Sequence, residues 1–416
     1  MRSRFYPILL TGDLQTAFLQ VRMKEEERDV LRFHWRAPES DKTEVYRFTR
    51  ALFGLTSSPF LLGGVISQHL KTWEDRYPEL VRELRDGLYV DDLMTGGSTV
   101  EEVHAKRTEA IEVFEDARFT LHKWHSNVVE LENEEPQQKD GELTFAKQQL
   151  GSSQSDTKLL GLTWDKGQDT LSVAFVHKGT APTKRGVLSR LAKIYDPLGL
   201  ASPTTLQGKL FYREICETNL AWDAVLPEPL KRRWDSWCAN LPEWVTVPRT
   251  LAPCRQRVSK VTLHAFGDAS IHGVAAAVYA VVQQKEGTTQ GLVCAKARLA
   301  KRNLTIPRLE LVSGHMAVNL ATNARSALNT HAVSTVHCWL DSTVALYWIK
   351  GRGEYRQFVS NRVHKIQQHA DIEWHHVPTT ENPADLGSRG GTVTDHQLWK
   401  QGPSWLSDPF PSGHQI

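Results

Sequence analysis

Acidic residues in two parts of the sequence have the types and surroundings that suit divalent cations. In the first group, Asp13 follows the apolar run Tyr6–Leu10, and Asp91 and Asp92 interrupt the β-prone stretch Gly87–Thr95. Two divalent cations about 3.5–4 Å apart, held by carboxylate oxygens, support in-line phosphoryl transfer. An Asp-Asp pair also suits an ordinary turn. However, two adjacent charges among apolar residues are costly without a cation. We therefore predict a metal site if the two strands are neighbours.

The second group follows in order along the C-terminal part of the chain. Asp268 ends a predicted strand, Glu310 begins a predicted helix, Asp341 follows another strand and Asp385 lies in Asn382-Pro383-Ala384-Asp385. Singly, these acids could serve as turn residues, favour a helix N-terminus or cap a helix. Together, such carboxylates could hold two metal ions that direct a water molecule at a phosphodiester.

The elements that must position the second group alternate between strands and helices. The pattern predicts three strands, a helix, a strand, a helix and a strand, which indicates a mixed α/β sheet. The predicted segments are Val261–Gly267, Val274–Val282, Leu292–Ala297, Leu309–Leu328, Val336–Leu340, Phe358–Gln368 and Ile372–His376.

The elements before this region are more varied. Ser98 and Glu101 form a capping-box pattern that predicts the start of a helix. Residues 242–257 show little pattern and are predicted to be a linker. The other predictions are strands over Glu44–Thr49 and Leu159–Asp165, a hairpin over Gly87–Thr95, and helices over Pro59–Trp73, Thr183–Thr218 (broken at Asp196–Gly199) and Pro227–Trp237.

Composition limits the class of protein. The 416 residues are 40% hydrophobic and 24% charged, which suits a globular protein of more than one domain. The formal charge of +2 does not by itself indicate a nucleic-acid binder. The five cysteines include no Cys-x-x-Cys pair, which argues against a zinc module and a disulfide framework. No apolar stretch is long enough to span a bilayer, so we expect no membrane association and an intracellular location.

Several motifs carry a family resemblance. Tyr89-Val90-Asp91-Asp92 resembles the reverse-transcriptase signature, and Thr11–Gln20 resembles the family's first catalytic motif. Phe53–Phe60 resembles the next motif, in a form that is similar to the Pao/BEL class of LTR retrotransposons. The same class is indicated by Leu121–Asn127, Leu160–Trp164, Thr183–Ser189 and Ile194–Leu200.

The resemblance implies a multidomain α/β and α+β protein, part of a retrotransposon Pol polyprotein. It implies a partial reverse-transcriptase palm over 1–126, a polar loop or insertion over 127–158 and a helical thumb or connection region over 159–258. A mixed α/β RNase H-like domain then covers 259–390, and a C-terminal linker or tail covers 391–416.

The resemblance also implies the sites and partners. We expect two Mg²⁺ or Mn²⁺ ions at each site, held by Asp13, Asp91 and Asp92 in the polymerase and by Asp268, Glu310, Asp341 and Asp385 in the nuclease. Substrate-binding residues are then Phe18 as a gate against the ribose 2′-hydroxyl, and Phe53, Gly54, Pro59 and Tyr89. The implied partners are RNA, DNA, RNA–DNA hybrids and dNTPs, with protease and integrase parts outside this chain. The implied locations are cytoplasmic element particles and the nucleus.

Two further interpretations follow from the sequence. The chain begins about a dozen residues before Asp13, where the family has a fingers region, so we expect poor polymerisation. The alternative function is a catalytically inactive or repurposed nucleic-acid-binding remnant. An aspartic protease is rejected, because Asp341-Ser342-Thr343 and Asp156-Thr157-Lys158 lack the required glycine.

Histidines and basic clusters remain open. His375 has the spacing of the family's mobile product-release histidine, and His376 is beside it, but Val377-Pro378 follows both, so we favour histidines that simply end a strand. Clusters of Lys and Arg could contact phosphates or form solvated helix faces. These clusters are Lys184-Arg185, Lys231–Arg233, Lys296–Arg302 and Arg352–Arg356.

Overall fold

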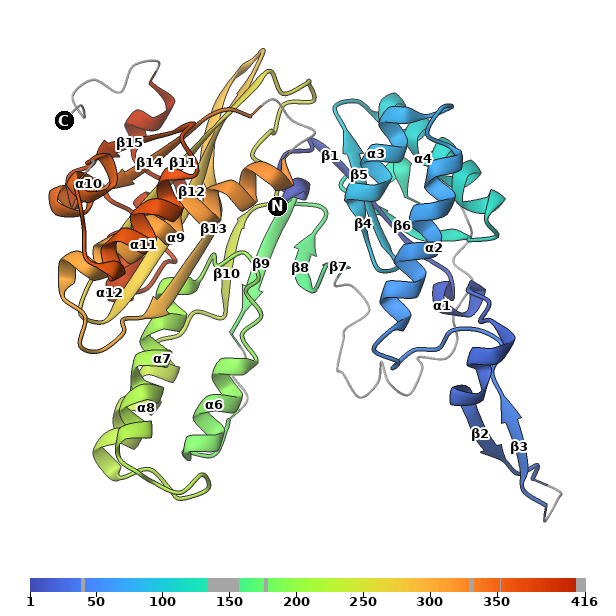
Figure 1. Ribbon diagram of the computed structural model, residues 1–416, viewed down its shortest axis with the longest axis horizontal. Helices are drawn as coiled ribbons and strands as arrows, with labels where there is room; N and C mark the ends of the chain where they lie inside the picture. Colours follow the sequence, from blue (N-terminus) through green and yellow to red (C-terminus); the bar gives the residue numbers. More distant parts are fainter. Residues whose placement is uncertain (39–41, 133–156, 176–178, 329–332, 352, 409–416) are drawn as a thin grey trace. The chain divides into compact units, whose positions relative to one another are not determined.

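The computed structural model describes residues 1–38, 42–132, 157–175, 179–328, 333–351 and 353–408. The chain forms two compact units (Figure 1): unit 1 comprises Met1–Pro7 and Leu150–Ile416, and unit 2 comprises Ile8–Gln149. Both units combine helices and sheets, which confirms the predicted multidomain α/β and α+β class. Within the described ranges, no helix is both long and apolar enough to cross a membrane. Most of the predicted insertion 127–158 lies outside the described residues.

Unit 2 is built on an antiparallel sheet in the order β4-β5-β1-β6. Its strands are β1 (Ile8–Leu14), β4 (Leu88–Tyr89), β5 (Asp92–Gly97) and β6 (Leu121–Ser126). Strand β1 contains the predicted apolar run but continues to Leu14, so Asp13 lies inside the strand. Ile8, Leu10 and Leu93 are fully buried in the core beneath this sheet.

The helices of unit 2 pack on this sheet and on one another. Helices α3 (Pro78–Gly87) and α4 (Val100–Asp116) contact the sheet, and α2 (Ser58–Thr72) contacts α3 and the short α1 (Ala17–Gln20). The hairpin of β2 (Arg32–Trp35) and β3 (Glu44–Arg47) extends from this unit (Figure 1). The helix predicted over 59–73 and the hairpin predicted over 87–95 are confirmed.

The predicted capping box of α4 is wrong by one residue. Thr99 is the N-cap, and its hydroxyl accepts a hydrogen bond from the Glu102 amide at 3.2 Å. The Glu102 carboxylate in turn accepts a hydrogen bond from the Ser98 amide at 2.8 Å. Two exposed helix-start amides are thereby satisfied, as the pattern requires, but by Thr99 and Glu102 rather than Ser98 and Glu101.

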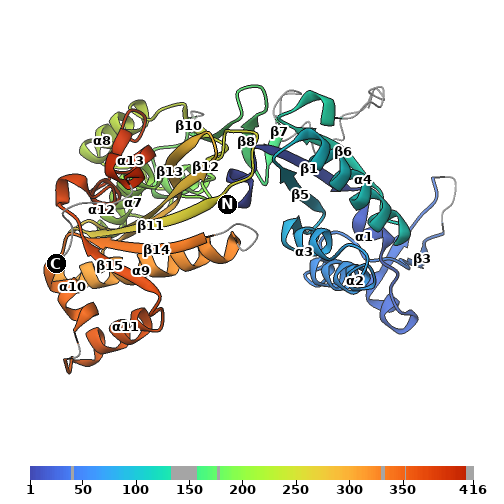
Figure 2. The ribbon, with the colours of Figure 1, turned by 90° about the horizontal axis from the view of Figure 1, so that it is seen from above.

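Unit 1 contains a mixed sheet in the order β13-β12-β11-β14-β15. Its strands are β11 (Lys260–Ala269), β12 (Gly273–Gln284), β13 (Gly287–Leu299), β14 (Val333–Leu340) and β15 (Ile372–His376). Strands β11, β12 and β13 are antiparallel, whereas β14 and β15 run parallel to β11. Helices α9 (Ile306–Ala327), α10 (Thr343–Lys350) and α11 (Gln357–Gln367) lie on one side of the sheet (Figure 2). The predicted order of strands and helices is confirmed, although α10 has no counterpart in the prediction.

The C-terminal stretch packs on the opposite side of this sheet, where α7 (Ser202–Glu217), α12 (Ala384–Arg389) and α13 (Gln397–Gln401) lie (Figure 2). The side chain of Trp399 is 1% exposed, and its indole donates to the Leu200 carbonyl at 2.8 Å. The Trp405 indole donates to Glu381 at 2.6 Å. The predicted linker or tail over 391–416 is therefore wrong for the described residues 391–408, because two tryptophans anchor them to the domain.

A second antiparallel sheet in unit 1 has the order β10-β9-β8-β7. Its strands are β7 (Thr157–Leu159), β8 (Leu162–Asp165), β9 (Thr170–Ala174) and β10 (Trp244–Pro248). The segment 242–257 contains β10, so the predicted linker is wrong there: Val245 and Val247 alternate with exposed residues and fill the core. Helices α6 (Lys184–Ala192) and α8 (Glu228–Ala239) pack with α7, and the predicted break between α6 and α7 is confirmed.

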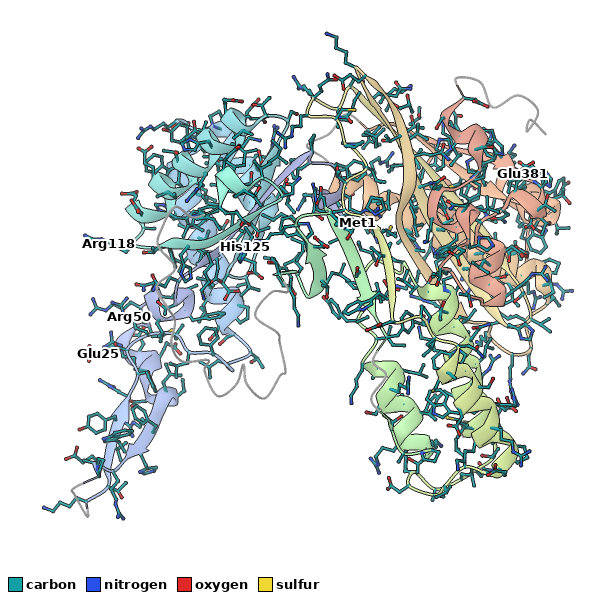
Figure 3. The ribbon with its side chains drawn as sticks, turned by 180° about the vertical axis from the view of Figure 1, so that it is seen from behind. Met1, Glu25, Arg50, Arg118, His125 and Glu381 are labelled. Carbon is teal, nitrogen blue, oxygen red and sulfur yellow. The ribbon has the colours of Figure 1, made fainter. Side chains whose placement is uncertain are left out.

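A buried arginine attaches the N-terminal residues to unit 1. Arg249 is fully buried, and its Nε lies 2.5 Å from Asp169 Oδ1. The same guanidinium donates to the carbonyls of Tyr6 and Pro7 at 2.8 and 3.1 Å. Met1 also packs against the core of this unit, beside its strands (Figure 3). Short 3-10 helices span Arg2–Arg4, Glu25–Leu31, Val129–Leu131, Thr379–Glu381 and Ser404–Ser407.

Candidate active sites

The first carboxylate cluster consists of Asp13, Asp91 and Asp92 in unit 2. Strands β1 and β5 are antiparallel neighbours, and Asp13 lies directly opposite Asp92. The Leu14 amide donates to the Asp91 carbonyl at 2.8 Å, which holds the turn against β1. One carboxylate oxygen from each acid lies within 4.8 Å of the others. The structure thus brings the three predicted residues together, in an arrangement that suits oxygen ligation of hard cations.

The turn that carries Asp91 has a strained backbone. Val90 has a φ of +60°, in the left-handed region, between the paired residues Tyr89 and Asp92. A β-branched residue rarely adopts this conformation, which costs roughly 1–2 kcal/mol. The flanking strands impose it, and as a result Asp91 lies beside Asp13 at the end of the hairpin.

The charges in this cluster repel one another. Burial raises the pKa of Asp91, and the Asp13 carboxylate raises it further. Burial also raises the pKa of Asp92, followed by the charges of Asp91 and Asp13. His122 on β6 places its Nε2 2.8 Å from Asp13 Oδ2. A cation bound among the three carboxylates would offset their repulsion.

The predicted substrate-binding residues surround this cluster in the sequence. Phe18 is buried, and its ring meets that of Phe53 edge-on, with centroids 4.7 Å apart. The Phe53 and Tyr89 side chains are exposed. Gly54 adopts a φ of +89°, which favours glycine, and Pro59 lies in the first turn of α2. Among these five residues, the structure therefore shows side-chain contact between Phe18 and Phe53.

The second carboxylate cluster consists of Asp268, Glu310 and Asp341 in unit 1. Asp268 lies at the end of β11 and Asp341 directly follows β14, and because these strands are parallel neighbours the two acids emerge at the same edge. Glu310 lies in the first turns of α9. One carboxylate oxygen from each of the three lies within 4.8 Å of the others. The predicted convergence of these acids is present in the structure.

Burial dominates the electrostatics of the second cluster. Asp268 is 3% exposed and Glu310 is 6% exposed. Burial, together with the charges of neighbouring carboxylates, raises the pKa of Asp268 to about 7 and that of Glu310 to about 9. Glu310 Oε1 accepts a hydrogen bond from the Ala269 amide at 3.3 Å, whereas Oε2 is buried with no hydrogen-bond partner among the described residues. Such an atom is costly in a protein interior, and a cation would satisfy it.

Asp385 lies outside this three-residue group. It is in the first turn of α12, and its Oδ1 lies 2.6 Å from Arg389 Nε. Its charge nonetheless contributes to the raised pKa of Asp268, after burial and the Asp341 charge, so it lies nearby. The role of Asp385 as a fourth ligand stays a prediction: the carboxylates of Asp268, Glu310 and Asp341 meet, and that of Asp385 pairs with Arg389.

Several supporting residues were not predicted. The Ser388 hydroxyl donates to Asp268. The Thr379 hydroxyl donates to Asp341 Oδ2 at 2.7 Å. The Asn382 side-chain amide donates to the Gly267 carbonyl at 3.0 Å, which fixes the loop before α12. Only Asn382 gave a signal in the sequence, since it belongs to the Asn-Pro-Ala-Asp motif.

His375 and His376 end β15, as predicted. The His375 ring stacks on Trp339 with centroids 4.5 Å apart, and burial followed by the charge of His337 lowers its pKa to about 4. This packing agrees with the preference for a strand-end histidine. A role of His375 or His376 in product release stays untested.

Many arginines of the basic clusters are paired with acids in unit 1. Arg185 lies 2.7 Å from Asp223, and Arg233 lies 2.6 Å from Glu214. Arg302 pairs with Glu217. These pairs favour the interpretation of solvated helix faces for Arg185 and Arg233, whereas Arg302 lies in a turn between β13 and α9. Arg352 of the last cluster lies outside the described residues.

Known proteins match the two parts of the chain separately. Residues 2–163 match the family described as reverse transcriptase (RNA-dependent DNA polymerase), and residues 183–342 match the family of the Pao retrotransposon-like RNaseH-like domain. The first match contains the first carboxylate cluster, and the second contains the second cluster. The chain is also 33% identical over 107 residues to a Gag-Pol polyprotein of Feline leukemia virus, a match that covers 26% of this chain and 6% of that protein. The chain therefore spans a small part of that relative's length.

Proposed function

Because the chain belongs to the Pol proteins of Pao-type retrotransposons, with a reverse-transcriptase domain and an RNase H-like domain, we propose that it has two phosphoryl-transfer sites. The first carboxylate cluster serves RNA-templated DNA synthesis. The second cluster, with Asp385, serves cleavage of the RNA strand in RNA–DNA hybrids. The observation that carries this proposal is the buried oxygen of Glu310, which has no hydrogen-bond partner in the described part of the chain and belongs to a group of three close carboxylates.

Both clusters fit Mg²⁺ or Mn²⁺, with two ions at each site. When bound, such ions supply activation of the nucleophile and neutralisation of phosphate charge. Asp13, Asp91 and Asp92 would hold them in unit 2. In unit 1, Asp268, Glu310 and Asp341 would hold them, and Asp385 would join after its pair with Arg389 opens. The raised pKa values of Asp268 and Glu310, caused first by burial and then by neighbouring carboxylates, support this assignment, because a bound cation stabilises the charged form of both acids.

The neighbours of the second cluster are positioning residues. Ser388 and Thr379 each donate to one of its carboxylates, which leaves the other oxygen of each acid to face a cation. Asn382 ties the loop that carries Thr379 to the end of β11. These bonds fix the carboxylates before substrate binds, which is what a preorganised site requires.

In the polymerase site, Phe18 acts as the gate against the ribose 2′-hydroxyl, while Phe53, Gly54, Pro59 and Tyr89 contact template and incoming nucleotide. The Phe53 ring lies against Phe18, and Phe53 is exposed.

The proposal includes the partners. The substrates are RNA, DNA, RNA–DNA hybrids and dNTPs. The chain acts with protease and integrase parts of a longer polyprotein, in cytoplasmic element particles and in the nucleus.

Paired variants test the proposal. The full chain is assayed for primer extension on an RNA template and for RNA cleavage in a hybrid, in Mg²⁺ and in Mn²⁺. Asp92→Asn should abolish extension and leave cleavage intact, and Asp268→Asn should do the reverse. If either variant loses both activities, the proposal of one function for each cluster is contradicted.

Metal-dependent stability separates a working enzyme from a nucleic-acid-binding remnant. A functional site binds Mg²⁺ or Mn²⁺ in the folded state only, so the ion raises the melting temperature. Asp268→Asn should remove the part of this shift that belongs to unit 1. An unchanged melting temperature in both ions would favour the remnant.

A further inference from the structure

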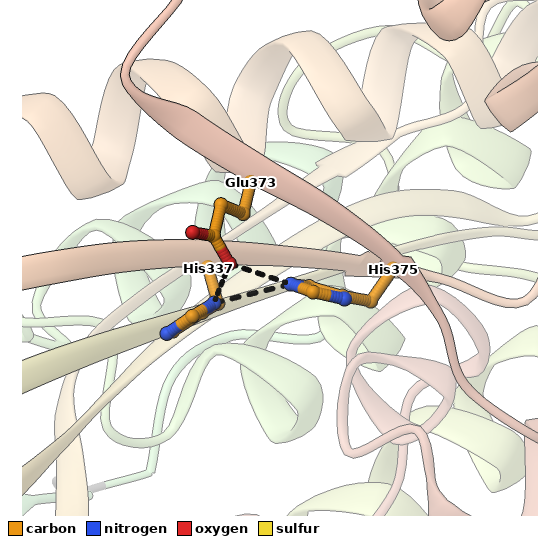
Figure 4. A group of neighbouring side chains, drawn as sticks. All are labelled: His337, Glu373 and His375. Atoms are coloured by element: carbon orange, nitrogen blue, oxygen red, sulfur yellow. Dashed lines mark hydrogen bonds and ion pairs between the residues drawn. The ribbon is translucent and has the colours of Figure 1, made fainter. Parts of the chain in front are cut away.

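A third group of potential ligands lies away from both carboxylate clusters. His337 is on β14, and Glu373 and His375 are on the neighbouring parallel strand β15, where Glu373 is directly opposite His337 (Figure 4). His337 Nδ1 lies 3.1 Å from His375 Nε2 and 3.2 Å from Glu373 Oε2. His375 Nε2 lies 3.5 Å from Glu373 Oε2. Three potential donor atoms therefore form a nearly equilateral triangle.

The size of this triangle matches one face of a tetrahedral metal site. Zinc binds imidazole nitrogen and carboxylate oxygen at about 2.0–2.2 Å, and tetrahedral angles then place neighbouring ligand atoms about 3.3–3.6 Å apart. The observed separations of 3.1, 3.2 and 3.5 Å need at most a small adjustment. We propose that His337, Glu373 and His375 bind a divalent transition-metal ion, with Zn²⁺ as the best fit.

Aromatic neighbours hold both imidazoles in place. His375 stacks on Trp339 with centroids 4.5 Å apart, and His337 stacks on His264 at 5.0 Å. The Trp339 indole donates to His264 Nδ1 at 3.2 Å, which fixes these two partners relative to each other. The imidazoles therefore lose little conformational freedom when a metal binds, which favours affinity.

The donor set distinguishes this site from the carboxylate clusters. Imidazole nitrogen suits Zn²⁺, Cu²⁺ and Ni²⁺, whereas Mg²⁺ prefers an all-oxygen shell. The Glu373 side chain is 60% exposed, and those of His337 and His375 are 21% and 23% exposed. The fourth position accordingly opens to solvent, where water or an added ligand completes the coordination.

A metal at this site would clamp the edge of the sheet. Strand β15 is the last strand of the order β13-β12-β11-β14-β15, so only one of its edges is paired in that sheet. The proposed ligands lie on both β14 and β15, and the bound ion therefore links the edge strand to its neighbour. Binding to the folded state alone should raise the thermal stability of unit 1.

A shared proton is the competing explanation. One imidazole N–H placed among the same three atoms would account for similar separations, since 3.1 Å is also a hydrogen-bond distance. The two explanations differ in their response to Zn²⁺. A proton-linked triad without metal affinity gives no saturable binding, whereas the proposed site does.

Zinc titration of the full chain tests the proposal. Excess Mg²⁺ is present throughout to occupy the carboxylate clusters, and heat of binding is recorded by calorimetry. We expect one zinc ion to bind tightly per chain, and Co²⁺ in its place to give the intense visible absorption of a tetrahedral complex. Glu373→Gln alters an exposed side chain and should not impair folding, yet it should lower zinc affinity at least about tenfold, because even the loss of an outer-shell partner typically costs that much.

The matched pair His375→Gln and His376→Gln adds a positional control. Both residues are on β15, but neighbouring strand residues face opposite sides of a sheet. His375→Gln should weaken zinc binding and remove the zinc-dependent rise in melting temperature, while His376→Gln should retain both. The proposal is overturned if the unaltered chain binds no zinc in excess Mg²⁺, or if Glu373→Gln and His375→Gln bind it as tightly as the unaltered chain.

Discussion

Arg389 holds the carboxylate of Asp385 through an ion pair in which Nε and Oδ1 are 2.6 Å apart. The arginine side chain is 63% exposed, so this pair contributes at most about 1 kcal/mol. Arg389 nevertheless competes with any cation for the Asp385 carboxylate.

We predict that Arg389→Gln increases the Mg²⁺ affinity of the RNase H-like site a few-fold, measured by calorimetry, with little change in melting temperature. The Asp385→Asn, Arg389→Gln double variant should lose that gain, and weaker Mg²⁺ binding by Arg389→Gln would contradict the competition.

The raised pKa of Glu310 predicts how stability depends on pH when divalent ions are chelated. A carboxyl whose pKa is higher in the folded state keeps its proton longer there, so its stabilising contribution is complete below its unfolded pKa. That contribution is lost as pH rises towards about 9, the raised value. The contribution of Asp268 is lost in the same way as pH rises towards about 7, the raised pKa of that carboxyl. In EDTA, therefore, stability should decline between pH 7 and 9 more steeply in the unaltered chain than in Glu310→Gln.

Melting temperatures in EDTA across this range test the pH prediction. Groups that titrate in both the unaltered chain and Glu310→Gln contribute equally to both curves, so their effect cancels in the difference. Mg²⁺ should raise the melting temperature more at pH 9 than at pH 7, because the ion binds the deprotonated carboxylates. Parallel curves for the two proteins would show that Glu310 does not carry a raised pKa.

The structure also shows why sequence patterns located the acids but not their partners. Asp268 lies at the end of one apolar strand and Asp341 follows another, and short apolar runs make such strands visible without any tertiary information. Ser388 and Thr379 reach the cluster only because the chain folds back after β15, and no local pattern encodes that return. Asp385 was predicted as a ligand from its motif, yet its pairing with Arg389 depends on side-chain positions four residues apart on a short helix.

Element boundaries failed where tertiary contacts overrode weak local signals. Segment 242–257 contains prolines and a cysteine, and the five-residue alternation that forms β10 was too short to stand out. The stretch after residue 390 is rich in proline and glycine, which favours a linker interpretation. Trp399 is nevertheless buried and the partly buried Trp405 packs on Phe266 and Trp339 of the sheet, and these contacts decide the structure.

Arg249 should be essential for the stability of unit 1. It is fully buried, pairs with Asp169 at 2.5 Å and donates to carbonyls of the N-terminal segment. Arg249→Met leaves the Asp169 carboxylate without its buried partner, and we expect a loss of about 3–5 kcal/mol in thermal or urea unfolding. The control is Arg232→Met, which breaks an exposed pair with Glu228 and should cost less than about 1 kcal/mol. Similar losses in both variants would contradict this assignment.

Trp399 should be part of the folded RNase H-like unit rather than of a linker. Its side chain is 1% exposed, and Tyr279 donates to its carbonyl at 2.7 Å. Trp399→Ala removes this packing and the indole hydrogen bond, so we expect destabilisation by about 3–5 kcal/mol. Trp222→Ala, at a 47% exposed position in the same unit, is the matched control and should have a much smaller effect. Equal melting temperatures for the unaltered chain and Trp399→Ala would restore the linker interpretation.

Cleavage of the RNA strand in an RNA–DNA hybrid tests the central claim most directly. The second carboxylate cluster should cut that strand in Mg²⁺ or Mn²⁺ and leave the DNA strand intact, and EDTA should stop the reaction. Asp268→Asn removes a buried carboxylate from the cluster and should lower the rate at least about 100-fold. Cleavage that persists in Asp268→Asn, or no cleavage by the folded, unaltered chain in either ion, would contradict the account.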